Sequence, residues 1–251
     1  HDHEYLEKVR LWDKQSFTSL LHGSEAYQAP SLERRMQAFL QQSMPLGVRR
    51  VDSFVDVADG IALDDGRGAL NTALRMKTLF QGGIDFRVGA YASFGFRSSH
   101  PADWERFAKA AADADFIATS PERDDPGFYG ADSDHIGLDA HFSRTLELAL
   151  ALRKPLHFHI DQQVTPYEGC TEALLQHLDT TRHRAQFTQQ GGQKPLIWLV
   201  HMISPVTYER GRLDRLLDRL AGYRIGVICC PSAVVHRARG RSIEAPSGTA
   251  G

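Results

Sequence analysis

Residues 155–162 read PLHFHIDQ, and this stretch shows the pattern that decides the fold. It is a short apolar run that begins at a proline and ends at polar residues. Such runs are typical of strands buried on both faces of a parallel sheet. His157 and His159 are two residues apart, so both side chains leave the strand on the same face. The stretch therefore predicts a buried strand whose end carries side chains capable of chemistry.

Five further apolar runs of the same kind occur along the chain of 251 residues, and helical patterns lie between them. The runs span 48–57, 86–92, 115–120, 195–202 and 224–230. Helices are predicted at 69–80, 101–114, 135–153, 171–184 and 205–220, and the polar segment 13–44 is also helical in character. Ser204 is predicted to cap the last of these helices. Strands and helices that alternate every roughly 30–40 residues build either a (β/α)₈ barrel or a doubly wound sheet.

Composition and missing motifs exclude several classes of protein. Lys and Arg number 29 against 31 Asp and Glu, which leaves a formal net charge of -2 and no basic field for nucleic acid. The sequence holds no run of 18 apolar residues that would span a membrane. Neither a dinucleotide-binding fingerprint nor a P-loop is present. The three cysteines make a poor disulfide framework, so we expect a reducing compartment and a cytoplasmic protein.

Histidines at the predicted strand ends are the main candidates for chemistry. His159 ends one strand, His201 ends the next, and His1 and His3 form a pair that again lies on one face. Imidazoles that converge from separate strands would bind one divalent metal, and zinc and iron(II) both accept such ligands. The remaining histidines are expected to be solvated rather than ligating: His22, His100, His135, His141, His177, His183 and His236.

Two other candidates have open alternatives. His157 either contacts the substrate or is an interior histidine that orients a neighbour. Glu122 lies in the charged cluster 121–125 after a strand end, and this cluster either binds a polar substrate or only solvates a loop. The adjacent Cys229 and Cys230 are not in a nucleophile elbow and are expected to serve packing, so covalent acyl transfer has little support.

In this order, the motifs resemble those of the amidohydrolase superfamily, and most of all its cytosine deaminase-like branch. Residues 54–59 (FVDVAD) look like that branch's second-strand T-H-V-D-V-x-D. Residues 159–162 (HIDQ) are similar to its fifth-strand H-x-D-E, and His201 falls at its sixth-strand histidine. Residues 230–232 (CPS) fall where the family has a proline at the end of strand seven. The resemblance runs over residues 1–246, nearly the whole chain.

The resemblance implies a (β/α)₈ barrel with one zinc or iron(II) ion, sometimes two, at its mouth. His1 and His3 would be ligands from the first strand, and His159 the ligand from the fifth. His201 would lie beside the metal and hold water or substrate. The family's remaining ligand is an Asp at the end of strand eight. We therefore expect residues 1–251 to form one hydrolase barrel domain without the body of strand one and without the strand-eight unit.

Three positions depart from the pattern of that branch. Gln162 replaces the Glu that serves as proton shuttle, and an amide can only orient or bind through hydrogen bonds. Phe54 replaces the second-strand histidine. Ser93 aligns roughly with the third-strand Gln that contacts a pyrimidine edge, so it is a candidate for substrate binding. Asp161 and Gln162 are expected to position the substrate, while His201 stabilises the developing oxyanion.

The function expected from these residues is metal-dependent hydrolysis of a C–N bond in a small polar substrate, such as a linear or cyclic amide. One alternative keeps the metal and changes the reaction to deamination of an N-heterocycle. Another is a degenerate barrel that binds a ligand without catalysis. We expect no partner among nucleic acids or membranes, and assembly into a homo-oligomer is common among barrels of this type.

Overall fold

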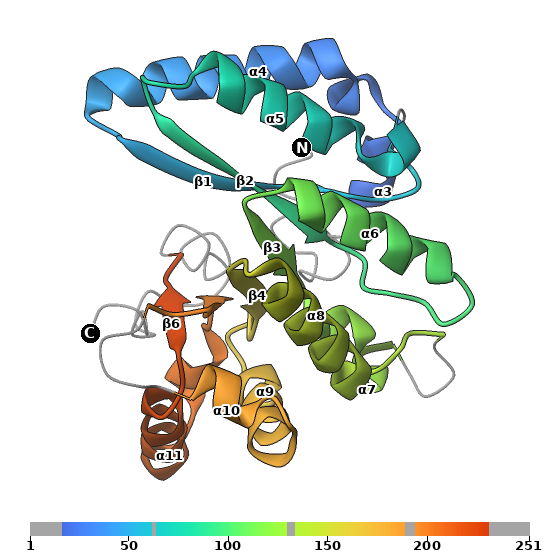
Figure 1. Ribbon diagram of the computed structural model, residues 1–251. Helices are drawn as coiled ribbons and strands as arrows, with labels where there is room; N and C mark the ends of the chain where they lie inside the picture. The colour runs from blue at the N-terminus through green and yellow to red at the C-terminus, as the bar shows by residue number, and fades with distance from the viewer. Residues whose placement is uncertain (1–16, 62–63, 130–133, 189–193, 231–251) are drawn as a thin grey trace, which may run out of the picture.

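The computed structural model describes residues 17–61, 64–129, 134–188 and 194–230. They form a six-stranded parallel sheet in which neighbouring strands follow one another in chain order, from β1 to β6. Helices lie along the outside of the curved sheet (Figure 1). In the described part of the chain, no helix combines the length and the hydropathy that a membrane crossing requires.

The strands are β1 (Arg50–Asp56), β2 (Asp85–Ala92), β3 (Phe116–Thr119), β4 (Leu156–Ile160), β5 (Ile197–His201) and β6 (Ile225–Ile228). The helices are α3 (Thr18–His22), α4 (Ala29–Ser43), α5 (Gly68–Leu79), α6 (Pro101–Asp113), α7 (Pro126–Tyr129), α8 (Leu138–Leu152), α9 (Cys170–Thr180), α10 (Arg184–Phe187) and α11 (Arg210–Ala221). Short 3₁₀ turns join them: η1 (Glu25–Tyr27), η2 (Met44–Leu46), η3 (Asp64–Gly66), η4 (Pro121–Asp124) and η5 (Ser204–Thr207).

Strand order distinguishes the two architectures that the sequence pattern allowed. A doubly wound sheet reverses its strand order at a switch point, whereas a barrel adds each new strand beside the last. Every neighbouring pair here is parallel and consecutive, from β1 with β2 to β5 with β6. The expected barrel fold is therefore confirmed over six strands, and all six predicted runs form strands of the sheet.

The predicted helices are also present, with one error at a cap. Pro101 begins α6, as its fixed φ favours, and the polar segment before β1 forms α3 and α4. The prediction that Ser204 caps a helix over 205–220 is wrong. Ser204 instead begins the 3₁₀ turn η5, and α11 starts later, at Arg210. The Ser204 hydroxyl is used elsewhere, because it lies within hydrogen-bond distance of two acceptors, the Gln163 carbonyl oxygen at 2.6 Å and the Glu168 carboxylate.

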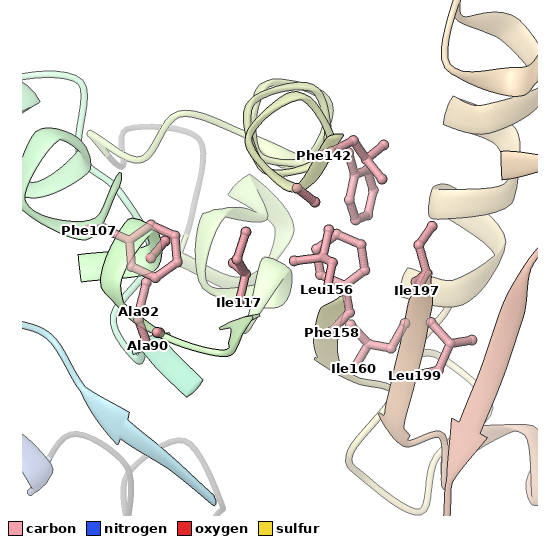
Figure 2. Packing of buried hydrophobic residues seen from close by; sticks show 14 of the residues in the cluster. Ala90, Ala92, Phe107, Ile117, Phe142, Leu156, Phe158, Ile160, Ile197 and Leu199 are labelled. Carbon is pink, nitrogen blue, oxygen red and sulfur yellow. The ribbon is translucent and has the colours of Figure 1, made fainter. Parts of the chain in front are cut away.

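The hydrophobic core lies between the sheet and the helices. Alternate residues of β4, namely Leu156, Phe158 and Ile160, point from the strand into this layer, where Phe142 of α8 meets them (Figure 2). The ring centroids of Phe142 and Phe158 are 5.6 Å apart in an edge-to-face arrangement. This alternation leaves His157 and His159 on the opposite face of β4, inside the curve of the sheet.

Close approach of one ring to the backbone makes Gly89 of β2 a sensitive position. A Cβ atom there would lie 2.2 Å from the ring of Phe116 on β3. We expect Gly89→Ala to lower the free energy of unfolding by about 1–3 kcal/mol, because the ring must leave its packed position. At Gly23 nothing lies within 4 Å of an added Cβ. Urea unfolding of Gly23→Ala should therefore match the wild type to within about 0.5 kcal/mol, and equal losses in both variants would contradict the steric argument.

Candidate functional site

Two histidines meet where β4 and β5 end. His159 lies near the carboxyl end of β4 and His201 is the last residue of β5. Nδ1 of His159 and Nε2 of His201 are 3.3 Å apart. His201 has a φ of 82°, a left-handed conformation that is uncommon for a residue with a side chain. Such backbone strain is concentrated at functional sites, where the surrounding structure holds it in place.

The separation of the two imidazoles suits a shared metal ion. Zinc–nitrogen bonds of about 2.0–2.1 Å in a tetrahedral site place two ligand nitrogens about 3.3–3.4 Å apart. His159 and His201 therefore have the chemistry and the spacing of two metal ligands, and the same distance also permits a hydrogen bond between the rings. The other two predicted ligands, His1 and His3, lie outside the described residues.

An aromatic wall stands beside His159. Its ring centroid lies 4.6 Å from that of Phe54 on β1 and 5.0 Å from that of Tyr91 on β2. Phe54 and Tyr91 pack on each other at 4.7 Å. Burial raises the pKa of the Tyr91 phenol above its ordinary value, so the hydroxyl keeps its proton. The wall offers flat apolar surface next to His159, and the Tyr91 hydroxyl bonds to the Ser120 side chain.

Gln162 joins the ends of β3 and β4. Its amide nitrogen donates to Ser120 Oγ and to the His159 carbonyl oxygen, at 3.3 Å each, and lies 3.5 Å from Glu122 Oε2. The amide is buried, so its protein contacts are those of a residue that orients its neighbours. The expected role of Gln162 in orienting substrate stays a prediction.

The Asp161 side chain is hydrogen-bonded to the protein backbone. Its carboxylate accepts hydrogen bonds from the backbone N–H groups of Cys170 at 2.8 Å and Thr171 at 3.1 Å, the first two residues of α9. Its side chain is fully buried, and its φ is 51°. Burial raises the pKa of the carboxyl. These contacts make Asp161 the anchor of α9 and do not support the predicted contact with substrate.

Glu122 is buried in a group of three carboxylates. Oxygen atoms of Glu122, Asp161 and Glu168 all lie within 4.8 Å of one another, and residues of this kind could hold a metal. Each carboxylate already accepts protein hydrogen bonds, from the Asp161 N–H, from α9 and from Ser204 respectively. Burial, then the charges of Glu168 and Asp161, raise the pKa of Glu122 well above its ordinary value. The alternative that this residue only solvates a loop is wrong.

His157 lies toward the opposite end of the sheet. Its ring stacks on Phe116 at 4.3 Å, and it lines a cavity together with Arg50 and Asp115, where the strands begin. The placement fits the interior-histidine alternative and does not support contact with substrate. Ser93, the other predicted binding residue, is buried directly after β2, at the same end of the sheet as His159.

A buried polar network lies behind the ends of β2 and β3. Asp124 accepts from both His141, at 2.6 Å, and His135, at 2.8 Å, and from the backbone N–H of Phe96 at 2.8 Å. The other ring nitrogen of His141 lies 2.9 Å from Thr119 Oγ1. Burial acts to raise the pKa of Asp124, but the bonds from the two imidazoles and the Phe96 N–H lower it overall. This network fixes the loop that follows β2.

The expectation that the remaining histidines are solvated is wrong for several of them. His22 is buried and bonded to Asp56 at 3.0 Å, and Tyr27 donates to the same carboxylate oxygen at 2.6 Å. The other buried members are His141, His177 and His183. Their carboxylate partners lie 17 to 38 residues away in sequence, and no local pattern shows which carboxylate a histidine will meet. The adjacent cysteines also differ from expectation, since Cys229 is exposed.

Several solved structures are similar in fold to this chain. A 5-methylcytosine deaminase from Klebsiella pneumoniae, liganded with phosphonocytosine, has a TM-score of 0.74 and 20% identity, covering 95% of this chain and 52% of its own. The same enzyme with 5-fluorocytosine gives a TM-score of 0.72. N-isopropylammelide isopropylaminohydrolase from Burkholderia multivorans gives 0.57 at 19% identity, covering 86% of this chain and 55% of its own.

At 19–20% identity, these likenesses show that the chain shares the fold of these structures. The chain spans about half the length of the solved structures it matches. No family model matches the sequence, and no curated protein matches it either.

The titration of His157 predicts an acid-labile fold. Burial lowers the pKa of this imidazole to about 4, so the folded protein favours the neutral ring. Its contribution to stability is complete above the ordinary pKa of 6.5 and is lost as the pH falls from there toward 4. We expect His157→Phe, which keeps the stack on Phe116, to reduce this acid loss by on the order of 3 kcal/mol. Urea unfolding at pH 4.5 and 7 measures it, and His100→Phe, in an exposed loop, should leave the slope unchanged.

The buried Glu122 predicts the opposite dependence on pH. Because its folded pKa is raised, its contribution is complete below the ordinary value of 4.5 and is lost as the pH rises through the folded pKa. The side chain of the Glu122→Gln variant is neutral at every pH. The melting temperature of this variant should therefore exceed that of the wild type by a margin that grows from pH 5 to pH 8. Glu33→Gln, at the surface beside Arg75, is the matched control. A difference that stays constant over this range would show that Glu122 does not titrate there.

Proposed function

We propose that this chain carries part of a metal-dependent hydrolase that cleaves a C–N bond in a small polar substrate. The observation that carries the proposal is the pair of imidazoles at the ends of β4 and β5, with Nδ1 of His159 and Nε2 of His201 3.3 Å apart. The fold supports it, because active sites of (β/α)₈ barrels lie at the carboxyl ends of the strands. Zinc and iron(II) are the proposed metals, held by His159 with His1 and His3, and His201 lies beside the metal, close enough to contact the ion or its water.

The described residues have distinct roles in such a reaction. A divalent ion at His159 would activate water for attack on the substrate. The His201 imidazole, next to it, would donate a hydrogen bond to the oxygen that gains charge during attack. Phe54 and Tyr91 would pack against a flat substrate. Gln162 holds the ends of β3 and β4 in register and transfers no proton.

Deamination of an N-heterocycle is the second candidate. It is favoured by the names of the similar structures, a deaminase and an aminohydrolase. It is weakened by Gln162, which stands where the deaminase branch has its proton-shuttle Glu and cannot carry a proton. The same residue favours a third reading, in which the barrel binds its ligand without turnover. The proposal also includes a small-molecule substrate, a homo-oligomeric assembly and a cytoplasmic location. The three free cysteines support the cytoplasmic location.

Metal binding provides the first test. We expect the purified protein to bind zinc, iron(II) or manganese(II). His159→Ala and His201→Ala should each weaken metal binding by about 10–100-fold or more, since a loss of that size is typical when an outer-shell partner is removed. Elemental analysis and competition with a chelating dye measure it. His100→Ala, which removes an exposed imidazole, should bind metal like the wild type. A protein that binds none of the three metals would rule the proposal out.

The reaction product separates the candidates. With metal bound, cyclic amides should open to carboxylates without release of ammonia, whereas aminopyrimidines and aminotriazines release ammonia when they are deaminated. We expect turnover on the amide panel and a far smaller ammonia signal on the heterocycle panel, because of Gln162. Ammonia release as the main activity would favour the deaminase, and metal binding without turnover on either panel would favour the non-catalytic barrel.

A further inference from the structure

A cavity of about 370 Å³ opens beside the aromatic wall. It lies at the carboxyl ends of β1 and β2, and Ala92, the last residue of β2, forms part of its lining. The preceding residue, Tyr91, packs against His159. Successive residues of a strand point to opposite faces, so the cavity is at the same end of the sheet as the two imidazoles but on the other face of β2. Its volume is within the range of pockets that hold small molecules.

Two guanidinium groups in the lining share one carboxylate. Arg97, in the loop after β2, bonds to Asp103 at 3.1 Å, and Arg106 on α6 bonds to the other oxygen of Asp103 at 2.9 Å. Arg106 has a second partner in Asp65, whose side chain is 65% exposed, so water screens that pair. A third guanidinium, that of Arg123, lines the cavity from η4 and is buried.

Each of the two guanidinium groups that bond to Asp103 uses only some of its N–H donors. Among the described residues, Arg97 bonds through Nη2 and Arg106 through Nε and Nη1. Within the described part of the chain, Nε and Nη1 of Arg97 and Nη2 of Arg106 make no hydrogen bond, and both residues line the cavity. Guanidinium groups prefer planar anions that accept two hydrogen bonds at once, and a carboxylate has this geometry.

The remaining walls are apolar and aromatic. Phe94, Phe96 and Phe107 line the cavity, and the rings of Phe96 and Phe107 pack on each other at 5.3 Å. Phe96 is held in place through its backbone N–H, which donates to the buried Asp124. A pocket with rigid aromatic walls and cationic donors at one end fits a flat molecule that carries a negative charge.

We propose that this cavity binds a planar ring carboxylate, whose carboxylate group is held by Arg97 and Arg106 and whose ring packs on the phenylalanines. The inference deepens the proposed function, on which it rests for the view that the cavity receives part of the substrate. It narrows the substrate class to small ring compounds with an acidic substituent.

Benzoate and benzamide make a matched pair of probes, since they have the same shape and differ in charge. Isothermal titration on the full chain, freed of metal with a chelator, measures binding without any need for turnover. We expect benzoate to bind about tenfold or more tightly than benzamide, because charge-assisted hydrogen bonds are about twice as strong as neutral ones. Equal affinities, or no binding of either probe, would overturn the proposal.

Three variants test the assignment of the donors. Arg97→Gln should lower benzoate affinity about tenfold, to that of benzamide, and Asp103→Asn should leave it unchanged or raise it, since it removes the competing carboxylate. Arg75→Gln, an arginine paired with Glu33 away from the cavity, is the control and should bind like the wild type. Benzoate affinity that is unaffected by Arg97→Gln would refute the assignment.

The metal site is tested separately. His159→Ala is expected to keep benzoate binding at the level of the wild type while it loses metal. If the proposed hydrolase function fails and benzoate still binds as described, only the link between the cavity and the substrate is lost. If metal binding and turnover hold but benzoate does not bind, the cavity proposal alone is wrong.

Discussion

One residue, Asp161, connects four elements of the site, and the positions of the others depend on it. Its carboxylate holds the first two N–H groups of α9, and its own N–H donates to Glu122 beyond β3. Its carbonyl oxygen accepts from the Ile203 N–H at 2.7 Å, just past β5. A left-handed φ directs these three groups to different neighbours. The ends of β3, β4 and β5 are therefore fixed relative to one another, and with them His159 and His201.

The polar groups at this end of the sheet are divided into two layers. The layer near the inside of the curve holds imidazoles, a phenol and an amide, and these groups work as ligands or hydrogen-bond donors without carrying a negative charge. The carboxylates of Asp161, Glu122 and Asp124 lie behind it, buried and bonded to backbone or imidazole donors. This division leaves these three carboxylates occupied by backbone and imidazole donors.

The strands could be predicted because each is a short apolar run with clear limits, and this signal is local. Their order was not available from periodicity, which fits a barrel and a doubly wound sheet equally well; the family motifs pointed to the barrel, and the consecutive pairing confirms it. Strand-end position was enough to find His159 and His201, whereas the roles of Asp161 and His157 depend on contacts with distant residues. The buried His22 and His141 were missed for the same reason, since Asp56 and Asp124 are their partners only in the folded chain.

The consecutive order of the strands also bears on how the chain folds. Each strand pairs with the one that precedes it by roughly 30–40 residues, so no pairing has to wait for a distant part of the sequence. During synthesis, a strand that leaves the ribosome finds its neighbour already made and partly covered by a helix. The sheet can grow in the direction of translation, one βα unit at a time, with the newest strand as its only growing edge. The two histidines are brought together late in this sequence, when β5 docks on β4.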